Sequence, residues 1–355
     1  MRGKVSDMRS ESGGEMANRE EAAESWSVEF AAPRSAHMVS GSVDMSDIGP
    51  HEVVVRARRS VISPGTELAW YRGQSFAGTS PRRAFPLRPG YAMAGTVLRA
   101  GVATGLEADM TVLSYTPHSS VVRFDKANVV CVPIEGDLAL AAVPFARLVQ
   151  VGGISLLASA ARPGDVVVVM GLGPVGNLVA QLAACSGFVV VGVEPSEQRR
   201  RIAADCGLRT LVSLDDAESA VERLGGARVV LECSGSPSAL LLATALCARY
   251  GEILTVGAPW GAETSVHVNA VMAGVFEKFL AIRSGWEWQW PRYDDRTGRS
   301  VESCAQWVLR RLSDNSIVTA PLVTDTIGPD EMPEAYRRLD SHPDENLTFL
   351  VDWER

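Results

Sequence analysis

A strand of buried character runs directly into a glycine-rich turn, and this junction constrains the fold more than any other feature. The strand is DVVVVM (165–170), the turn is GLGPVG (171–176), and a helical pattern then runs to residue 186. In such a unit the first glycine permits a tight turn, the second admits a pyrophosphate close to the backbone, and the third lets helix and strand pack. The helix N-terminus favours the anion. We therefore expect a dinucleotide to bind at Gly171, Gly173, Pro174, Val175 and Gly176.

Glu194 carries the prediction of which dinucleotide binds. It ends the next strand-like run, FVVVGVE, 23 residues after Gly171. An acidic side chain there accepts hydrogen bonds from ribose hydroxyls and repels a 2′-phosphate, which favours NAD over NADP. The arginines that follow, Arg199 to Arg201, are able to bind a 2′-phosphate instead, and this is the argument in favour of NADP. The alternative interpretation of Glu194 is a solvated residue at a strand end.

Strand and helix patterns alternate from residue 165 to residue 286. This alternation is typical of an α/β doubly wound domain with a parallel sheet. The six strand-like runs are 165–170, 188–194, 209–214, 228–235, 252–259 and 279–286.

The rest of the chain divides around this unit. Short apolar runs broken by turn residues, from Trp26 to about Val132, predict a compact β-rich domain. Residues 287–355 are too few for a core of their own, although they contain two helical stretches and a last strand, LTFLVDW. We predict a disordered tail over 1–25, one domain over 26–150 completed by 287–355, and a second domain over 151–286.

Composition excludes several classes of partner. The formal net charge of −8 leaves no basic footprint for nucleic acid. The apolar runs are too short to span a bilayer, and the first 25 residues do not resemble a signal peptide. Six cysteines stand singly, with no CxxC pair, as in reduced cytoplasmic proteins. We expect a cytoplasmic protein that acts on a small molecule, without nucleic acid or membrane.

Several longer segments resemble the medium-chain dehydrogenase/reductase superfamily over nearly the whole chain from Trp26. They are GPHEVVVRARRSVISPGTEL (49–68), FPLRPGYAMAGTV (85–97), RPGDVVVVMGLGPVG (162–176) and ECSGSPSAL (232–240). The resemblance implies a GroES-like catalytic domain, a Rossmann domain, hydride transfer between them, and a homodimer. The SxGTE and PLxPGY patterns are most similar to the zinc-independent branch that includes hydroxyethyl-chlorophyllide dehydrogenases. Further cofactor contacts implied by the match are Gln150, Ser234, Val256, Gly257, Ala258 and Ser284, with Gln150 and Ser284 near the nicotinamide.

The positions that match the zinc ligands of the superfamily do not carry ligands. By the resemblance, zinc members have a cysteine in the segment matched by residues 62–67, and a His-Glu pair where this chain has Gly90-Tyr91-Ala92. A third ligand would fall near Ala146. A catalytic zinc needs about three converging nitrogen, sulfur or oxygen ligands. We therefore predict no metal.

Without a metal, side chains must accept the proton and hold the oxygen of an alcohol. By the resemblance, Thr66 matches the proton-relay hydroxyl, Glu67 is the acid beside it, and Tyr91 takes the place of a lost ligand. His118 is the one histidine near the presumed cleft, and a histidine is a residue type suited to act as a base. Each has a structural alternative: Glu67 holds its own loop through backbone N–H groups, Tyr91 fills space, and His118 is a structural histidine.

Aromatic residues near the predicted cleft form two groups. Trp286, Trp288 and Trp290 alternate in GWEWQWP, and at strand spacing they would share one face. That face is either a wall for a ring-shaped substrate or a subunit interface. Trp70 and Tyr71 are further candidates for the substrate pocket.

These features lead to one main hypothesis and two rivals. The main hypothesis is reversible NAD(H)-linked oxidation of a secondary alcohol to a ketone on a cyclic or polyol substrate. The second is NADPH-dependent reduction of an activated alkene, against which stand Glu194 and SPGTEL in place of an NVxD-like segment. The third is a non-catalytic protein that senses a dinucleotide.

Overall fold

The computed structural model describes residues 22–75, 84–260, 266–294 and 298–355. Strand β1 (Ala22–Ala32) begins inside the predicted tail, and Ser25 in it donates to the Val121 carbonyl at 2.7 Å. Residues 22–25 are therefore ordered by strand pairing, which corrects that boundary of the prediction, and residues 1–21 lie outside the described ranges. Within those ranges no helix is both long and apolar enough to cross a membrane.

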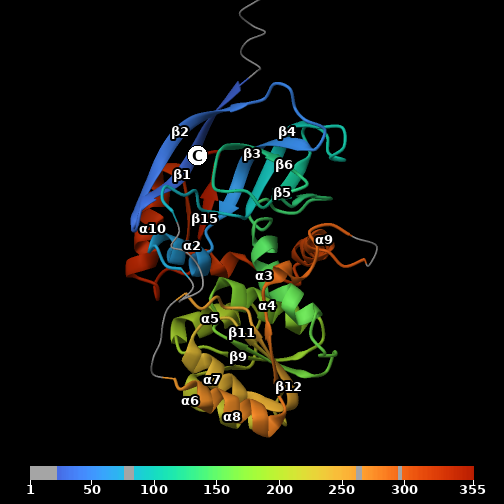
Figure 1. The fold of residues 1–355 in the computed structure, drawn as a ribbon, viewed down its shortest axis with the longest axis vertical. Helices are drawn as coiled ribbons and strands as arrows, with labels where there is room; N and C mark the ends of the chain where they lie inside the picture. The colour runs from blue at the N-terminus through green and yellow to red at the C-terminus, as the bar shows by residue number, and fades with distance from the viewer. Residues whose placement is uncertain (1–21, 76–83, 261–265, 295–297) are drawn as a thin grey trace, which may run out of the picture.

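The lower part of the molecule in Figure 1 is a six-stranded parallel sheet between two layers of helices. Its order, β10-β9-β8-β11-β12-β13, is the 3-2-1-4-5-6 order of a Rossmann sheet, and each predicted strand is confirmed. The valine-rich strands are buried because helices cover both faces. The strands are β8 (Val166–Met170), β9 (Val189–Val193), β10 (Leu211–Val212), β11 (Ala227–Glu232), β12 (Cys247–Thr255) and β13 (Ala281–Ser284). The helices are α4 (Pro174–Cys185), α5 (Glu197–Asp205), α6 (Leu214–Glu222), α7 (Pro237–Leu246) and α8 (Val268–Lys278).

The upper part is built on a seven-stranded, mostly antiparallel sheet with a two-stranded hairpin beside it. The last strand, β15 (Phe349–Asp352), pairs with β3, so the C-terminal segment adds a strand to this sheet. The strands are β1 paired with β2 (Ser35–Asp44), then β3 (Glu52–Val61), β4 (Met93–Ala100), β5 (Thr111–Ser114), β6 (Val121–Asp125), β7 (Cys131–Pro133), β14 (Asp325–Ile327) and β15. The remaining helical elements are α2 (Pro64–Tyr71), α9 (Val301–Ser313), α10 (Met332–Ser341), η1 (Glu287–Gln289), η2 (Ala320–Leu322) and η3 (Pro329–Glu331).

Helix α3 (Phe145–Leu157) joins the two parts and crosses the predicted boundary between residues 150 and 151. It is buried along almost its whole length and packs on both α4 and α9. Gly152 and Gly153 allow the close approach, because a Cβ atom there would lie 3.0 and 2.9 Å from Val179 and Leu182. The boundary is thus a shared core helix rather than a linker.

The tryptophan run does not form the strand that its spacing predicts. Strand β13 ends at Ser284, and residues 287–289 form the 3₁₀ turn η1. Glu287 is buried because it forms an ion pair with Arg147. This ion pair directs the backbone at residue 287 away from the sheet. As a result Trp286 is 65% exposed, whereas Trp290 packs against the core.

Candidate functional site

The glycine turn is tight at its first and third glycines and open at its second. Gly171 has a φ of +83°, and a Cβ atom on Gly176 would lie 1.8 Å from the Gly171 carbonyl oxygen. Gly173 is the N-cap of α4, and a Cβ atom there would meet nothing within 4 Å. No side chain of the described residues caps this helix. The turn therefore presents an open backbone cradle at a helix N-terminus, as a pyrophosphate requires.

The other predicted cofactor residues follow neighbouring strands at the same sheet edge. Ser234, after β11, lies against Gly171, where an added Cβ would be 3.1 Å from the serine Cβ. Gly257, between Val256 and Ala258 after β12, packs still more closely on Gly235, where an added Cβ would lie 2.2 Å from the Gly235 nitrogen. Ser284 ends β13. This edge is the crevice in which doubly wound folds bind ligands.

Sequence reasoning missed Glu232, which organises this edge. Its carboxylate accepts the N–H groups of Ser234 at 2.7 Å and Gly235 at 3.0 Å. Burial raises its pKa. No local pattern distinguishes it from other acidic residues at strand ends.

Glu194 is 2% exposed, so it is not a solvated strand-end residue. Its two carboxylate oxygens accept the N–H groups of Leu172 at 2.7 Å and Ser196 at 3.0 Å. Each oxygen keeps acceptor capacity for a further donor. Arg199 donates to the Pro343 carbonyl at 2.9 Å, and Arg200 to the Glu194 carbonyl at 2.6 Å. The glycine turn and Glu194 together fit a dinucleotide.

A cluster of hydroxyl groups lies where zinc members carry ligands. The Tyr91 hydroxyl donates to Ser63 Oγ at 2.5 Å and also interacts with the Thr66 hydroxyl. Ser63 is the N-cap of α2, so the start of this helix aims both hydroxyls at Tyr91. Burial raises the pKa of Tyr91, although nearby Arg147 acts in the opposite direction. Tyr91 is therefore a neutral phenol that can donate a hydrogen bond.

Glu67 and His118 lie together behind this cluster, both almost fully buried. One Glu67 oxygen accepts the Ser63 N–H at 2.7 Å, and the other accepts the Tyr336 hydroxyl and lies 3.1 Å from His118 Nε2. His118 Nδ1 is 2.9 Å from Ser60 Oγ. Glu67 thus holds its own loop, as in the alternative interpretation, and His118 is bonded at both ring nitrogens. The geometry makes them positioning residues for Ser63 and hence for Tyr91.

Arg147, which the sequence analysis missed, carries a buried positive charge beside Tyr91. It is 4% exposed, and its guanidinium lies 5.0 Å from the Tyr91 ring centre, 4.7 Å from that of Tyr115 and 5.8 Å from that of Trp288. Its Nη2 pairs with Glu287, 140 residues away in the chain. The only sequence signal was its position next to Ala146, where a third zinc ligand was expected.

Two further site predictions are changed by the packing. Trp70 does lie beside the cluster, with its ring 6.3 Å from that of Tyr91. Tyr71 instead points into the core, where it stacks on Tyr336, because successive residues on a helix diverge by about 100°. This corrects its assignment to the pocket.

The Gln150 amide is fully buried. It accepts a hydrogen bond from the Tyr115 hydroxyl and donates one to the Val301 carbonyl, so both ends of the amide are already engaged.

A catalytic zinc ion does not fit these residues. Ser63, Tyr91 and Ala146 offer no normal zinc ligand set, and the adjacent Arg147 guanidinium would repel a second cation. Over the described ranges, no group of three His, Cys, Asp or Glu side chains could hold a metal.

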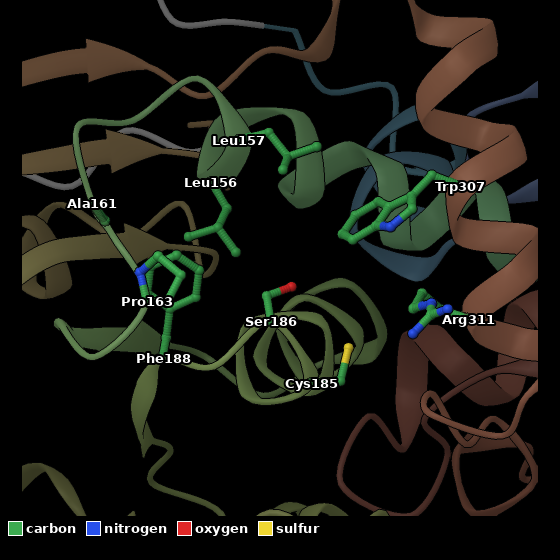
Figure 2. A pocket seen from close by; sticks show the side chains of 9 residues that line it. All are labelled: Leu156, Leu157, Ala161, Pro163, Cys185, Ser186, Phe188, Trp307 and Arg311. Carbon is green, nitrogen blue, oxygen red and sulfur yellow. The ribbon is translucent and has the colours of Figure 1, made fainter.

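The cavity shown in Figure 2 lies away from these groups. It has a volume of about 460 Å³ and opens between the C-terminal ends of α3 and α4 and the side of α9. Its lining includes Leu156, Ser186, Phe188, Trp307 and Arg311 and none of the predicted site residues. Because the glycine turn is at the opposite end of α4, this cavity is separate from the candidate site.

Comparisons with known proteins agree with this geometry. Residues 174–284 match the model of the family described as zinc-binding dehydrogenase. The chain is 28% identical to 2-desacetyl-2-hydroxyethyl bacteriochlorophyllide A dehydrogenase of Cereibacter sphaeroides, over 88% of this chain and 93% of that one. These findings support a relationship to the medium-chain dehydrogenase/reductase superfamily. The family-model match covers most of the Rossmann part of the chain, which contains none of the positions matched to zinc ligands.

Further dehydrogenases are similar over part of the chain or in fold. The 2-dehydro-3-deoxy-L-galactonate 5-dehydrogenase of Pseudoalteromonas atlantica is 25% identical over 54% of this chain and 52% of its own length. The L-idonate 5-dehydrogenase of Escherichia coli has the same fold, with a TM-score of 0.75, 16% identity, and coverage of 94% of this chain and 99% of that one. The fold class predicted from the sequence is thereby confirmed.

Proposed function

We propose that the chain is a zinc-independent, NAD(H)-dependent oxidoreductase that interconverts a secondary alcohol and a ketone on a cyclic or polyol substrate. The observation that carries this proposal is the hydroxyl cluster of Tyr91, Ser63 and Thr66 at the positions of the zinc ligands. The relatives named above, which include dehydrogenases of a sugar acid and of a macrocyclic pigment, support a hydroxylated or ring substrate.

The residues divide the chemistry between binding and proton transfer. Gly171, Gly173, Gly176 and Glu194 would hold NAD, which accepts a hydride from the alcohol when bound. In the reducing direction the Tyr91 hydroxyl turns from Ser63 and donates its proton to the ketone oxygen. The hydroxyls of Ser63 and Thr66 then relay a replacement proton from solvent, to which Thr66 is partly exposed. Oxidation uses the same path in reverse. Glu67 and His118 hold the relay in place from behind.

The test of this function is a titration of metal-analysed protein with NADH and NADPH, followed by fluorescence. We expect metal-free protein to bind NADH at least tenfold more tightly than NADPH, because Glu194 accepts ribose hydroxyls and repels a 2′-phosphate. The protein should then reduce NAD with at least one of cyclohexanol, myo-inositol and D-sorbitol. A preference for NADPH would favour alkene reduction, stoichiometric zinc would contradict the metal-free site, and cofactor binding without turnover would favour a sensing protein.

Tyr91→Phe is expected to lower kcat by about 100-fold or more, because general acid catalysis contributes about 10² to 10⁴. The ring stays in place over Arg147, so NADH affinity should be unchanged. The raised pKa of Tyr91 also sets the pH dependence. Since its folded pKa lies above the ordinary value of about 10, the neutral phenol and the ketone reduction that needs it are lost only as pH rises past that value. A pH profile of kcat/KM checks this, and a falling limb below pH 9 that disappears in Tyr91→Phe would contradict it.

A further inference from the structure

Arg147 has buried donor nitrogens that are left unsatisfied in the part of the chain that the structure describes. Its Nε and Nη1 are buried and have no partner among the described residues, while Nη2 pairs with Glu287. Buried polar groups in folded proteins are nearly always hydrogen-bonded, and each exception calls for an explanation. Two of the unpartnered buried atoms among the described residues belong to this one side chain, which stands next to the proposed proton relay.

The aromatic rings around Arg147 fix the guanidinium without satisfying those donors. Tyr91, Tyr115 and Trp288 surround it, and a ring face attracts the cation without supplying an oxygen acceptor. The Tyr115 hydroxyl is itself used on Gln150, and the Tyr91 hydroxyl on Ser63. The guanidinium is therefore fixed in a buried position while its Nε and Nη1 donors stay available for a ligand. A preorganised electrostatic site has this arrangement.

The local charge balance indicates what kind of oxygen these donors suit. Arg147 and Glu287 are a buried pair, with side chains 5% and 6% exposed, and together they are neutral. A second full anion would leave the interior with net negative charge, which burial disfavours. A ketone or alcohol oxygen brings no charge on binding, and the negative charge it develops during hydride transfer falls beside the guanidinium.

We propose that Arg147 is a catalytic residue that hydrogen-bonds the reacting oxygen of an uncharged carbonyl or carbinol group, and so fills the electrostatic role that zinc has in other members. This inference rests on the proposed function. Trp288, at 38% exposed, is the most exposed of the three rings around Arg147, so we place the entry of the oxygen beside it. Tyr91 then transfers the proton while Arg147 keeps its own.

The first test compares variants in which charge balance is kept. Arg147→Met combined with Glu287→Leu removes both charges, so neither residue is left buried without its partner. Proteins usually tolerate replacement of a whole buried ion pair by apolar residues of similar size. We expect this double variant to fold and bind NADH like the wild type, but to lose at least 100-fold in kcat, as for loss of an oxyanion donor. Arg292→Gln is the matched control, because Arg292 stacks on the same Trp288 ring at 5.4 Å but is exposed. Turnover of the double variant within threefold of wild type would overturn the inference and leave the proposed function intact.

The second test does not depend on turnover. Cyclohexanecarboxamide, a neutral carbonyl compound that resists hydride reduction, is titrated calorimetrically into NADH-saturated protein. We expect it to bind the wild type and Arg292→Gln equally, and the double variant at least tenfold more weakly. Equal binding to all three proteins, or no binding to the wild type, would overturn the role of Arg147. Failure of the wild type to bind NADH at all would instead count against the proposed function.

Discussion

Gly176→Ala is expected to destabilise the chain by about 3 kcal/mol and to abolish measurable NADH binding. The new Cβ would lie 1.8 Å from the Gly171 carbonyl oxygen, and this contact is with backbone, so no side chain can rotate away to relieve it. Overpacking of a well-packed site typically costs about 1–3 kcal/mol, and a backbone collision falls at the upper end. Urea unfolding followed by circular dichroism measures the stability, and NADH fluorescence measures the binding.

Gly173→Ala is the matched control, three residues earlier in the same turn. Its φ of −61° suits any residue, and its Cβ would meet nothing within 4 Å. We expect wild-type stability but at least tenfold weaker NADH binding, because the added methyl group occupies the space of the pyrophosphate. Undiminished binding by Gly173→Ala would show that the phosphates do not approach this backbone, whereas undiminished stability of Gly176→Ala would show that the turn can rearrange.

Glu67→Leu is expected to cost about 3–5 kcal/mol of folding free energy. Glu67 is fully buried and accepts hydrogen bonds from the Ser63 N–H and the Tyr336 hydroxyl, and it contacts His118. Removing the carboxylate leaves these groups without a partner in the interior, where each unsatisfied donor is costly. Glu67→Gln keeps the shape and one acceptor oxygen, so its loss should be smaller. The urea midpoint of each variant gives the comparison.

The exposed acid Glu197 supplies the control for Glu67. It pairs with Arg201 on the surface of α5, and Glu197→Leu should leave the urea midpoint nearly unchanged. A Glu67→Leu protein as stable as this control would mean that the network behind Tyr91 does not hold the loop. If Glu67→Leu is destabilised but turns over at the wild-type rate, the network behind Tyr91 contributes to stability and not to catalysis.

The glycine turn and the six strands of the Rossmann sheet were predictable because their determinants are consecutive residues. The valine-rich run before Gly171 and the glycine spacing act within one strand–turn–helix unit, so the sequence alone indicates both the elements and their order. The residue types at the positions matched to zinc ligands can also be read from the sequence, and the metal-free site inferred from them stays a prediction. The tryptophan run shows the limit of this reasoning, because its alternation is local whereas the ion pair that turns it out of the sheet is not.

The sequence by itself therefore determined the fold class and the place of the glycine turn, and it shows which residue types stand at the positions matched to zinc ligands. Only the tertiary structure decided which side chains gather around those positions. Glu67 meets Tyr336 across 269 residues, and Arg147 meets Glu287 across 140. The physical reason is that a buried charge is stabilised by whichever groups surround it in space, and no periodicity in the chain records pairings made at such distances.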